Sequence, residues 1–261
     1  MTGTKGIKIK SVKDIADMTE GGKKLARVKN LLKSQVKIGA NAQDLDRYAE
    51  ELILKEGGKP SFKMVSSYYW TTCVNVNDGI VHGIPKKELV FKKGDVVSVD
   101  IGMYYKGFHT DTSFTIGLDV DSVTEVFLET GKSALTEAIE SAKPGNHIFD
   151  ISNAIQKVVT KGKYSPVRAL VGHGVGKELH EEPQIPCFVS GVREESPNIL
   201  EGSVLAIEVM YVTGSGEVKL SSDGWTISTA DGTISALFEE TVAVTNKGPL
   251  VLTESDSVIT N

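Results

Sequence analysis

The 261-residue sequence carries 29 Lys and Arg against 34 Asp and Glu, a formal net charge of −5, and 40% of its residues are hydrophobic. Such a chain can form one large core or two small ones, and its acidic balance indicates no nucleic-acid partner. It has no run of roughly 18 apolar residues and no signal-peptide core at its start, so a cytoplasmic protein without a membrane partner is expected. Cys73 and Cys187 are too few for a disulfide framework or a cysteine-based zinc site, and we expect free thiols.

The first 80 residues predict two helices followed by a strand. Apolar residues recur at helical spacing over residues 11–35, with Gly21-Gly22 as a weak point. A second helix is predicted to begin near Asn41 or Asp44, to run to residue 54 and to end at Gly57-Gly58. Residues 71–76 alternate as a strand does, and the Asn-Asp-Gly run at 77–79 is typical of a turn.

Residues 97–111 predict a β-hairpin with a carboxylate on each arm. Apolar and polar residues alternate on the first arm, and a two-residue loop is expected at Tyr105-Lys106. In an antiparallel pair this loop would place Asp100 directly opposite Asp111. Their Cβ atoms would then be about 5 Å apart, and two anions so placed need a cation.

The second half of the sequence repeats the first. Residues 37–45 match residues 143–151, and residues 91–100 match residues 199–208, which places Glu208 where the first half has Asp100. Two α/β halves, at about 10–120 and 121–255, are therefore expected to be related by a pseudo-twofold axis. A site at their seam follows, since each half supplies a strand that ends in a carboxylate.

Two turn signals compete to define the strand partner of Glu208. A turn at Asp223-Gly224 would pair Glu208 with Glu239. The alternative, Asp231-Gly232, lies between β-prone residues 226–229 and 233–235, and it is the preferred prediction. In either case Glu239 is an acid on a strand that otherwise reads apolar.

A histidine between two glycines is the remaining ligand candidate. Gly172 and Gly174 remove side-chain bulk on both sides of His173 and let the backbone take unusual angles, as a residue in a crowded site requires. A glycine-rich connection with an ordinary histidine is the alternative interpretation of this segment alone.

Taken together, these residues resemble the metal ligands of the type I methionine aminopeptidases, and the resemblance extends from about residue 15 to residue 245. Five residues have the order and spacing of the family's ligands: Asp100, Asp111, His173, Glu208 and Glu239. His82, in Val-His-Gly-Ile-Pro (81–85), and His180, in His-Glu-Glu-Pro-Gln (180–184), match two further family histidines.

The resemblance implies the pita-bread fold, an α/β (α+β) architecture in which two pseudo-twofold-related halves form a central antiparallel sheet flanked by helices. Residues 1–261 would form a single catalytic domain. The implied function is removal of the N-terminal methionine from nascent proteins and peptides when the second residue is small. The chain's own Met1-Thr2 would be such a substrate.

The donor set agrees with a metal centre. Four carboxylates and one imidazole form a hard, oxygen-rich site that favours Mn(II), Fe(II) or Co(II). The resemblance implies that the site holds two divalent ions (Co, Mn, Fe or Zn), and a carboxylate can bridge two such ions. Asp111 and Glu239 resemble the bridging carboxylates. A water between the metals would lose a proton near neutral pH and attack the first peptide carbonyl. Glu208 resembles the general base, while His180 near the oxyanion and His82 near the scissile nitrogen would act as hydrogen-bond donors.

The resemblance also implies a methionine pocket, for which Cys73 and Trp225 match pocket positions and Tyr68 or Tyr69 is expected at the mouth. Ordinary core packing is the alternative for each. Two positions depart from the family pattern, because Val209 stands where proline is common and Thr110 where glycine is frequent. Neither change removes a ligand.

Three alternative functions remain open. A proline-directed aminopeptidase or prolidase shares the fold and metal set but usually has an extra N-terminal domain, and only about 70 residues precede the first sheet motifs here. An inactive pita-bread binding module typically loses ligands, whereas all five matching residues are present. A type II enzyme would need a helical insertion, and residues 180–208 are too few to hold one. The family is mostly monomeric, and the ribosome is a candidate partner.

Overall fold

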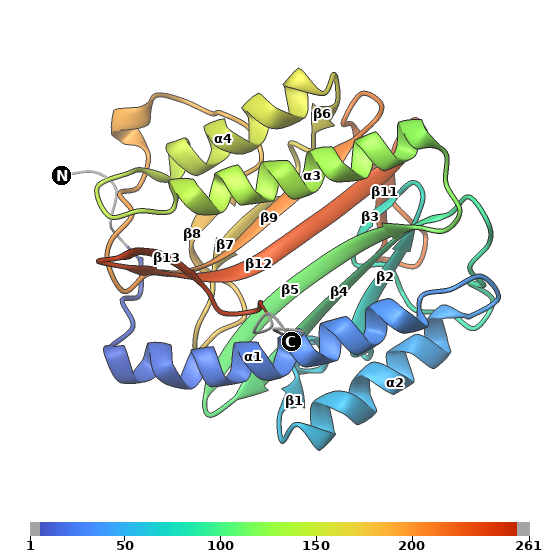
Figure 1. Cartoon of the computed structure of the whole chain (residues 1–261), viewed down its shortest axis with the longest axis horizontal. Coiled ribbons are helices and arrows are strands. Elements are labelled where there is room, and N and C mark those ends of the chain that lie inside the picture. Colours follow the sequence, from blue (N-terminus) through green and yellow to red (C-terminus); the bar gives the residue numbers. More distant parts are fainter. Residues whose placement is uncertain (1–5, 255–261) are drawn as a thin grey trace, which may run out of the picture.

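The protein is described by a computed structural model over residues 6–254, in which one large antiparallel sheet is covered by helices (Figure 1). The predictions for the first five residues, among them Met1-Thr2 as a substrate, lie outside this range. Within the described range no helix is long and apolar enough to cross a membrane. The helices are α1 (Val12–Gln35), α2 (Ala42–Lys55), α3 (Ser122–Ser141) and α4 (Ile148–Lys161), with short 3₁₀ turns at Phe62–Met64 and Arg193–Glu195.

In each half of the chain a pair of helices precedes a run of strands. The strands are β1 (Lys59–Pro60), β2 (Thr72–Val76), β3 (Gly79–Val81), β4 (Val96–Tyr105), β5 (Phe108–Gly117), β6 (Ser165–Pro166), β7 (Val171–Gly174), β8 (Glu181–Pro186), β9 (Val204–Val212), β10 (Val218–Leu220), β11 (Ile227–Thr229), β12 (Ser235–Thr245) and β13 (Gly248–Val251). The main sheet has the order β1-β4-β5-β12-β9-β7-β8, with β2 beside β4, β13 beside β12 and β6 beside β9. A small second sheet has the order β10-β11-β3.

The helices cover one face of the main sheet in two pairs. Figure 1 shows α1 and α2 along one side and α3 and α4 along the other. Helix α1 packs on β4 and β5, whereas α3 packs on β9 and β12. Val99 and Phe114 belong to the core beneath α1, and Phe238 belongs to the core beneath α3. Because neighbouring residues of a strand point to opposite faces, Asp100 and Glu239 lie on the face away from the helices.

The two N-terminal helices begin where the sequence predicts. Ser11 and Asp14 form a capping box at the start of α1, and the Asn41 side chain accepts a hydrogen bond from the Asp44 N–H at the start of α2. The expected weak point in α1 does not interrupt the helix. A Cβ atom added to Gly22 would lie 2.3 Å from the carbonyl oxygen of Leu252, so the glycine allows a close approach of the C-terminal segment.

The internal repeat has matching backbone conformations in its two copies. Helices α2 and α4 each have 14 residues, and the turns before them contain Gly39 with φ 87° and Gly145 with φ 88°. The turns before β4 and β9 likewise contain Gly94 with φ 87° and Gly202 with φ 83°. Left-handed angles of this kind favour glycine, which explains why the glycines of the repeat match.

The predicted β4–β5 hairpin forms, but its turn is one residue further along than predicted. Lys106 and Gly107, with φ 49° and φ 91°, are the two central residues, whereas Tyr105 pairs with Phe108 in the ladder. The prediction of Tyr105-Lys106 is wrong because a tight hairpin turn of type I′ needs positive φ at both central positions, and glycine adopts it readily.

This shift changes the register of the two aspartates. Asp111 lies opposite Gly102 and Asp100 lies opposite Ser113, so the predicted direct pairing of Asp100 with Asp111 is wrong. The two carboxylates are instead diagonal neighbours on one face of the sheet. Gly102 opens space beside them, since an added Cβ would lie 2.8 Å from the Cβ of Ser61.

The choice between the two turns near Glu208 is also corrected. Strands β10 and β11 form a hairpin around Asp223-Gly224, and the Asp223 carboxylate accepts hydrogen bonds from two N–H groups of that turn. The same register continues into β9 and β12, where Glu208 lies opposite Glu239. Asp231 instead accepts hydrogen bonds from the N–H of Ser215, in the connection from β9 to β10, and from the hydroxyl of Thr233, so the predicted hairpin turn at Asp231-Gly232 is wrong.

Candidate functional site

Side chains from both halves line one cavity of about 140 Å³ on the face of the sheet away from the helices. Strands β4, β5, β7, β9 and β12 each contribute one of the five candidate ligands. The cavity is lined by Phe62, Val65, Tyr68, Cys73, Val81, His82, Asp100, Asp111, His173, Leu179, His180, Glu208, Trp225 and Glu239. Every site residue predicted from the sequence is in this set except Tyr69, which is 73% exposed.

The four carboxylates are close enough to disfavour one another's charge. Burial raises the pKa of Asp100 to about 7. Burial, followed by the charges of Asp100 and Glu208, also raises the pKa of Asp111. Burial and the charges of neighbouring carboxylates likewise raise the pKa values of Glu208 and Glu239. A cation in the cavity would remove this repulsion.

The ligand atoms of this cluster fit a divalent ion. Atoms of Asp111, His173 and Glu239 all lie within 4.8 Å of one another. Two buried carboxylate oxygens, Oδ1 of Asp100 and Oε1 of Glu239, have no hydrogen-bond partner within residues 6–254. A buried polar atom without a partner is unfavourable, and coordination to a cation would satisfy both oxygens.

His173 has the orientation that a metal-binding imidazole needs. Its Nδ1 atom lies 2.9 Å from the carbonyl oxygen of Gly174, to which it donates when protonated, and its Nε2 atom lies 3.4 Å from Oε1 of Glu208. Burial, followed by the neighbouring His180, lowers the pKa of His173 to about 4, so the ring is neutral at pH 7. A neutral ring with Nδ1–H bonded to a carbonyl presents the Nε2 lone pair to the carboxylates.

The glycines around His173 provide space rather than unusual angles. Neither Gly172 nor Gly174 has a positive φ, so that part of the sequence prediction is wrong. An added Cβ would lie 2.7 Å from the carbonyl oxygen of Ala206 at Gly172 and 2.3 Å from that of Glu182 at Gly174. The glycines therefore let β7 approach its neighbours closely.

Two further histidines line the cavity from the irregular segments after β3 and before β8. His82 follows β3 with φ 56°, a left-handed conformation that is unusual for a residue other than glycine. Burial, followed by His180, lowers the pKa of His82, so it is neutral at pH 7 and keeps one N–H donor. The ring of His180 lies 4.5 Å from that of His173, centroid to centroid.

An apolar pocket adjoins the candidate ligands. The Tyr68 and Trp225 rings are 5.0 Å apart in an edge-to-face arrangement, and the Tyr68 hydroxyl donates to the carbonyl oxygen of Thr72 at 2.9 Å and lies 3.2 Å from Sγ of Cys73. Tyr68 is the aromatic residue at the pocket, while Tyr69 faces solvent. Cys73 and Cys187 are free thiols, as predicted.

Sequence reasoning missed five residues that shape this pocket. Four of them line the cavity, namely Phe62, Val65, Val81 and Leu179. They lie in a short 3₁₀ turn, in irregular segments or at the end of the three-residue strand β3, where no periodic pattern marks a wall. The carboxylate of Asp46 on α2 accepts hydrogen bonds from the N–H groups of residues 71 and 72 at 2.9 and 2.8 Å, and so holds the start of β2. A single acid on a helix gives no signal for such a role.

The two departures from the family pattern leave the strands regular. Val209 is fully buried and lies opposite Phe238 in an uninterrupted β9–β12 ladder. Thr110 is 1% exposed, and its hydroxyl has no hydrogen-bond partner among the described residues. Nothing in the structure explains the threonine at that position.

Comparison with known proteins agrees with this geometry. The model of metallopeptidase family M24 matches residues 16–246. The chain is 41% identical to a methionine aminopeptidase of Clostridium perfringens over 246 residues, 94% of this chain and 98% of that protein. It is 40% identical to methionine aminopeptidase 1 of Bacillus subtilis over 94% of this chain and 98% of that protein. The crystal structure of methionine aminopeptidase from Thermotoga maritima superposes with a TM-score of 0.92 at 38% identity, covering 95% of this chain and 100% of that one.

The fold and the carboxylate-rich cavity are those of a metallopeptidase. The chain belongs to metallopeptidase family M24 and, within it, to the methionine aminopeptidases. The prolidase from Pyrococcus furiosus shares the pita-bread fold at a TM-score of 0.72 and 21% identity, but this chain covers only 66% of that longer protein.

Proposed function

We propose that this chain hydrolyses the peptide bond after an N-terminal methionine when the second residue is small, by means of two divalent metal ions. The proposal rests on one observation. A carboxylate–imidazole cluster and an apolar aromatic pocket lie side by side in one cavity of about 140 Å³. The cluster suits hydrolysis, and the pocket suits one apolar side chain.

Five residues would hold the metal ions, namely Asp100, Asp111, His173, Glu208 and Glu239. We infer that Asp111 and Glu239, which lie at the seam between the halves, supply bridging carboxylates. Divalent ions bound there, Co, Mn, Fe or Zn, would supply Lewis acidity that polarises a peptide carbonyl and lowers the pKa of water. The oxygen-rich donor set favours Mn(II), Fe(II) or Co(II).

Glu208 is our candidate for the proton-handling residue. Its side chain is 13% exposed, so it borders the open part of the cavity, and burial raises its pKa. A carboxylate with a raised pKa accepts a proton at Oε more readily than an unperturbed one and can return it to a leaving amine.

His180 and His82 are proposed as donors to the substrate. His180, next to His173, would donate to the oxygen that gains charge in the reaction, and His82 would donate near the scissile nitrogen. Both line the cavity without being among the five proposed ligands, which supports roles toward the substrate.

The methionine side chain would enter the slot formed by Cys73, Trp225 and Tyr68. An unbranched, polarizable thioether fits such a slot and makes favourable contacts with aromatic rings. Nascent polypeptides would be the main substrates. We extend the proposal to a cytoplasmic monomer that works near the ribosome, which size-exclusion chromatography and co-sedimentation with ribosomes would test.

The decisive experiment measures turnover of Met-Ala-Ser and Ala-Pro-type peptides by metal-free protein supplied with Mn(II), Co(II), Fe(II) or Zn(II). We expect metal-dependent release of methionine from the first peptide. Preferred cleavage before proline would favour a prolidase, and no cleavage under any metal would favour a binding module.

A further inference from the structure

The two halves of the sheet meet at β5 and β12, and this seam has an unusual form. Strands β4 and β5 pair over their whole length, and β9 pairs with β12 over all nine of its residues. In contrast, β5 and β12 pair directly at only two positions, Glu239 with Ser113 and Glu240 with Thr112. Asp111 and Glu239, which offer metal-binding atoms from opposite halves, lie at this junction. The distance between these two side chains therefore depends on the contacts that hold β5 against β12.

Threonine hydroxyls provide further hydrogen bonds between β5 and β12 beside the two backbone-paired positions. Oγ1 of Thr241 on β12 accepts from the N–H of Asp111 at 2.9 Å and donates to its carbonyl oxygen at 2.7 Å. Oγ1 of Thr115 on β5 makes the same double contact with Leu237, at 3.0 and 2.6 Å. Oγ1 of Thr112 donates to the carbonyl oxygen of Glu239 at 2.8 Å.

A buried lysine on α1 anchors the middle of this seam from the helix side. Lys29 is 4% exposed, and its Nζ atom lies 2.5 Å from Oε1 of Glu240 on β12 and 2.9 Å from Oγ1 of Thr112 on β5. The other carboxylate oxygen of Glu240 accepts from the Thr253 hydroxyl at 2.5 Å. One ammonium group therefore contacts both strands of the seam.

We propose that Lys29 is a positioning residue for the metal centre, which it serves by fixing β5 and β12 at the residues that follow Asp111 and Glu239. The inference rests on the proposed function, since it assumes that these two carboxylates bind metal. Residues behind the ligands commonly set ligand orientation, and their loss weakens metal binding about 10- to 100-fold.

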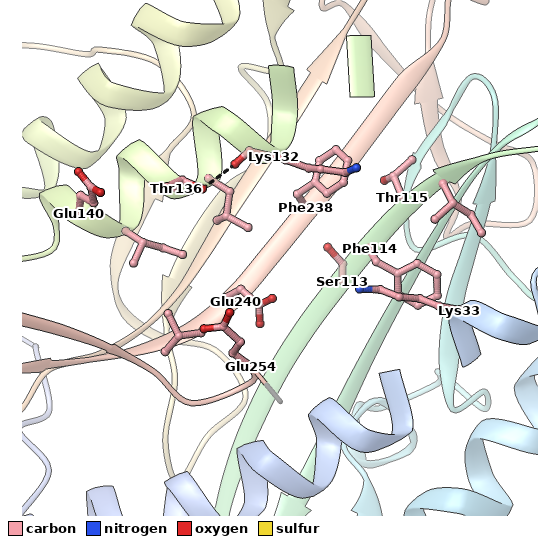
Figure 2. A pocket seen from close by; sticks show the side chains of 14 residues that line it. Lys33, Ser113, Phe114, Thr115, Lys132, Thr136, Glu140, Phe238, Glu240 and Glu254 are labelled. Carbon is pink, nitrogen blue, oxygen red and sulfur yellow. Dashed lines mark hydrogen bonds between the residues drawn. The ribbon is translucent and has the colours of Figure 1, made fainter. Parts of the chain in front are cut away.

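The neighbouring Lys33 provides a matched control. It lies one turn further along α1, and Figure 2 shows it with Glu240 at the cavity of about 490 Å³ between α1 and α3. The Nζ atom of Lys33 lies 5.4 Å from the ring centroid of Phe114, so its ammonium contacts one strand of the seam through an aromatic face. Replacing it removes the same charge from the same helix without touching Glu240 or Thr112.

The test is titration of Mn(II) into metal-free full-length protein by calorimetry, together with the absorption spectrum of the Co(II) form. For Lys29→Met we expect Mn(II) binding about 10- to 100-fold weaker and an altered Co(II) spectrum. The Mn(II) concentration needed for activity should rise by the same factor, while KM for Met-Ala-Ser at saturating Mn(II) stays unchanged. Lys33→Met should bind Mn(II) within about twofold of the wild type.

A double variant covers the possibility that Lys29→Met fails to fold with Glu240 left unpaired. Lys29→Met/Glu240→Gln removes the whole ion pair, a change that proteins often tolerate. Weaker Mn(II) binding by the folded double variant supports the inference, and wild-type affinity in either folded variant overturns it. If the wild type itself binds no Mn(II), the proposed metal site fails and the inference fails with it.

Discussion

Glu208 on β9 lies directly opposite Glu239 on β12, and both carboxylates line the same cavity. Like charges facing each other across a sheet destabilise it, and here burial strengthens the effect. With Asp100 and Asp111 beside them, four acids gather where the two halves of the sheet meet. Metal binding would therefore change stability as well as activity.

Replacing Asp111, one of the two proposed bridging carboxylates, should abolish the activity while the fold is retained. Asp111→Asn removes a negative charge from the residue proposed to contact both ions. We expect metal content and methionine release to collapse while the metal-free protein keeps its fold and its melting temperature rises, because one repelling charge is gone. Circular dichroism, metal analysis and peptide turnover measure the three quantities. A variant with near-normal metal stoichiometry and rate would show that the five-ligand assignment is wrong.

The raised pKa of Asp100 predicts a pH dependence of the metal-free protein. Burial raises the pKa of this group from an unfolded value of about 4 to about 7 in the folded state. Below about pH 4 both states are protonated, whereas between about pH 4 and pH 7 the folded state retains more protons, so its stability falls as pH rises. His173, with a pKa lowered to about 4, acts in the opposite direction as pH rises toward 6.5.

The contribution of Asp100 is isolated by comparison with Asp100→Asn. The melting temperature of metal-free wild type, minus that of the variant, should fall as pH rises from about 4 to about 7.5. Added Mn(II) should raise the melting temperature of the wild type at the higher pH, since a cation favours the ionised carboxylate. A difference that stayed flat or rose with pH would show that burial does not dominate at Asp100.

The sequence predicts the parts of this fold that local patterns specify. Helices α1 and α2 begin at Ser11 and Asn41 because those residues cap them, and the repeat is visible because its glycines share left-handed angles. The cavity gathers the matching acids and histidines because spacing along strands fixes which face each side chain takes.

Register was not predictable with the same certainty, because it depends on turn geometry and on long-range packing. Because the turn lies at Lys106-Gly107, one residue beyond its predicted place, Asp111 lies opposite Gly102. The hairpin at Asp223-Gly224 is hard to predict because the β-prone residues after it pair with β10 on one side and, on the other, with β3, which lies far away in the sequence. Lys29 gives no sign in the sequence of a buried role, since a lysine on a helix is normally solvated.

The two cavity histidines should affect turnover without affecting metal content. His180→Ala and His82→Ala each remove one donor to the substrate and should lower kcat by roughly 10² to 10³. Metal stoichiometry should equal that of the wild type, because neither residue is among the five proposed ligands. Loss of metal in His180→Ala would instead identify that residue as a ligand.

Substrate choice should follow the shape of the pocket. We expect Met-Ala-Ser to be cleaved, Leu-Ala-Ser and Met-Lys-Ser to be rejected, and a norleucine analogue to be cleaved slowly. One methylene in an apolar pocket is worth only about 1 to 3 kcal/mol. The second side chain would lie against the crowded metal face, so Gly, Ala, Ser and Thr should be accepted there and Leu, Lys and Phe rejected.

Phe62 tests whether the pocket wall sets this choice. Its ring lines the cavity and lies edge-to-face against Tyr68, with centroids 6.4 Å apart, so Phe62→Ala should enlarge the slot and increase cleavage of Leu-Ala-Ser relative to Met-Ala-Ser. Met64, in the same 3₁₀ turn but 52% exposed, provides the matched control, and Met64→Ala should keep the wild-type ratio. Mass spectrometry of competing peptides measures both ratios.

Because Phe62→Ala leaves every candidate ligand in place, metal content should not change. Equal cleavage of Leu-Ala-Ser and Met-Ala-Ser by the wild type would indicate a broad-specificity aminopeptidase, and an unchanged ratio in Phe62→Ala would place the selective contact elsewhere in the pocket, at Cys73 and Trp225.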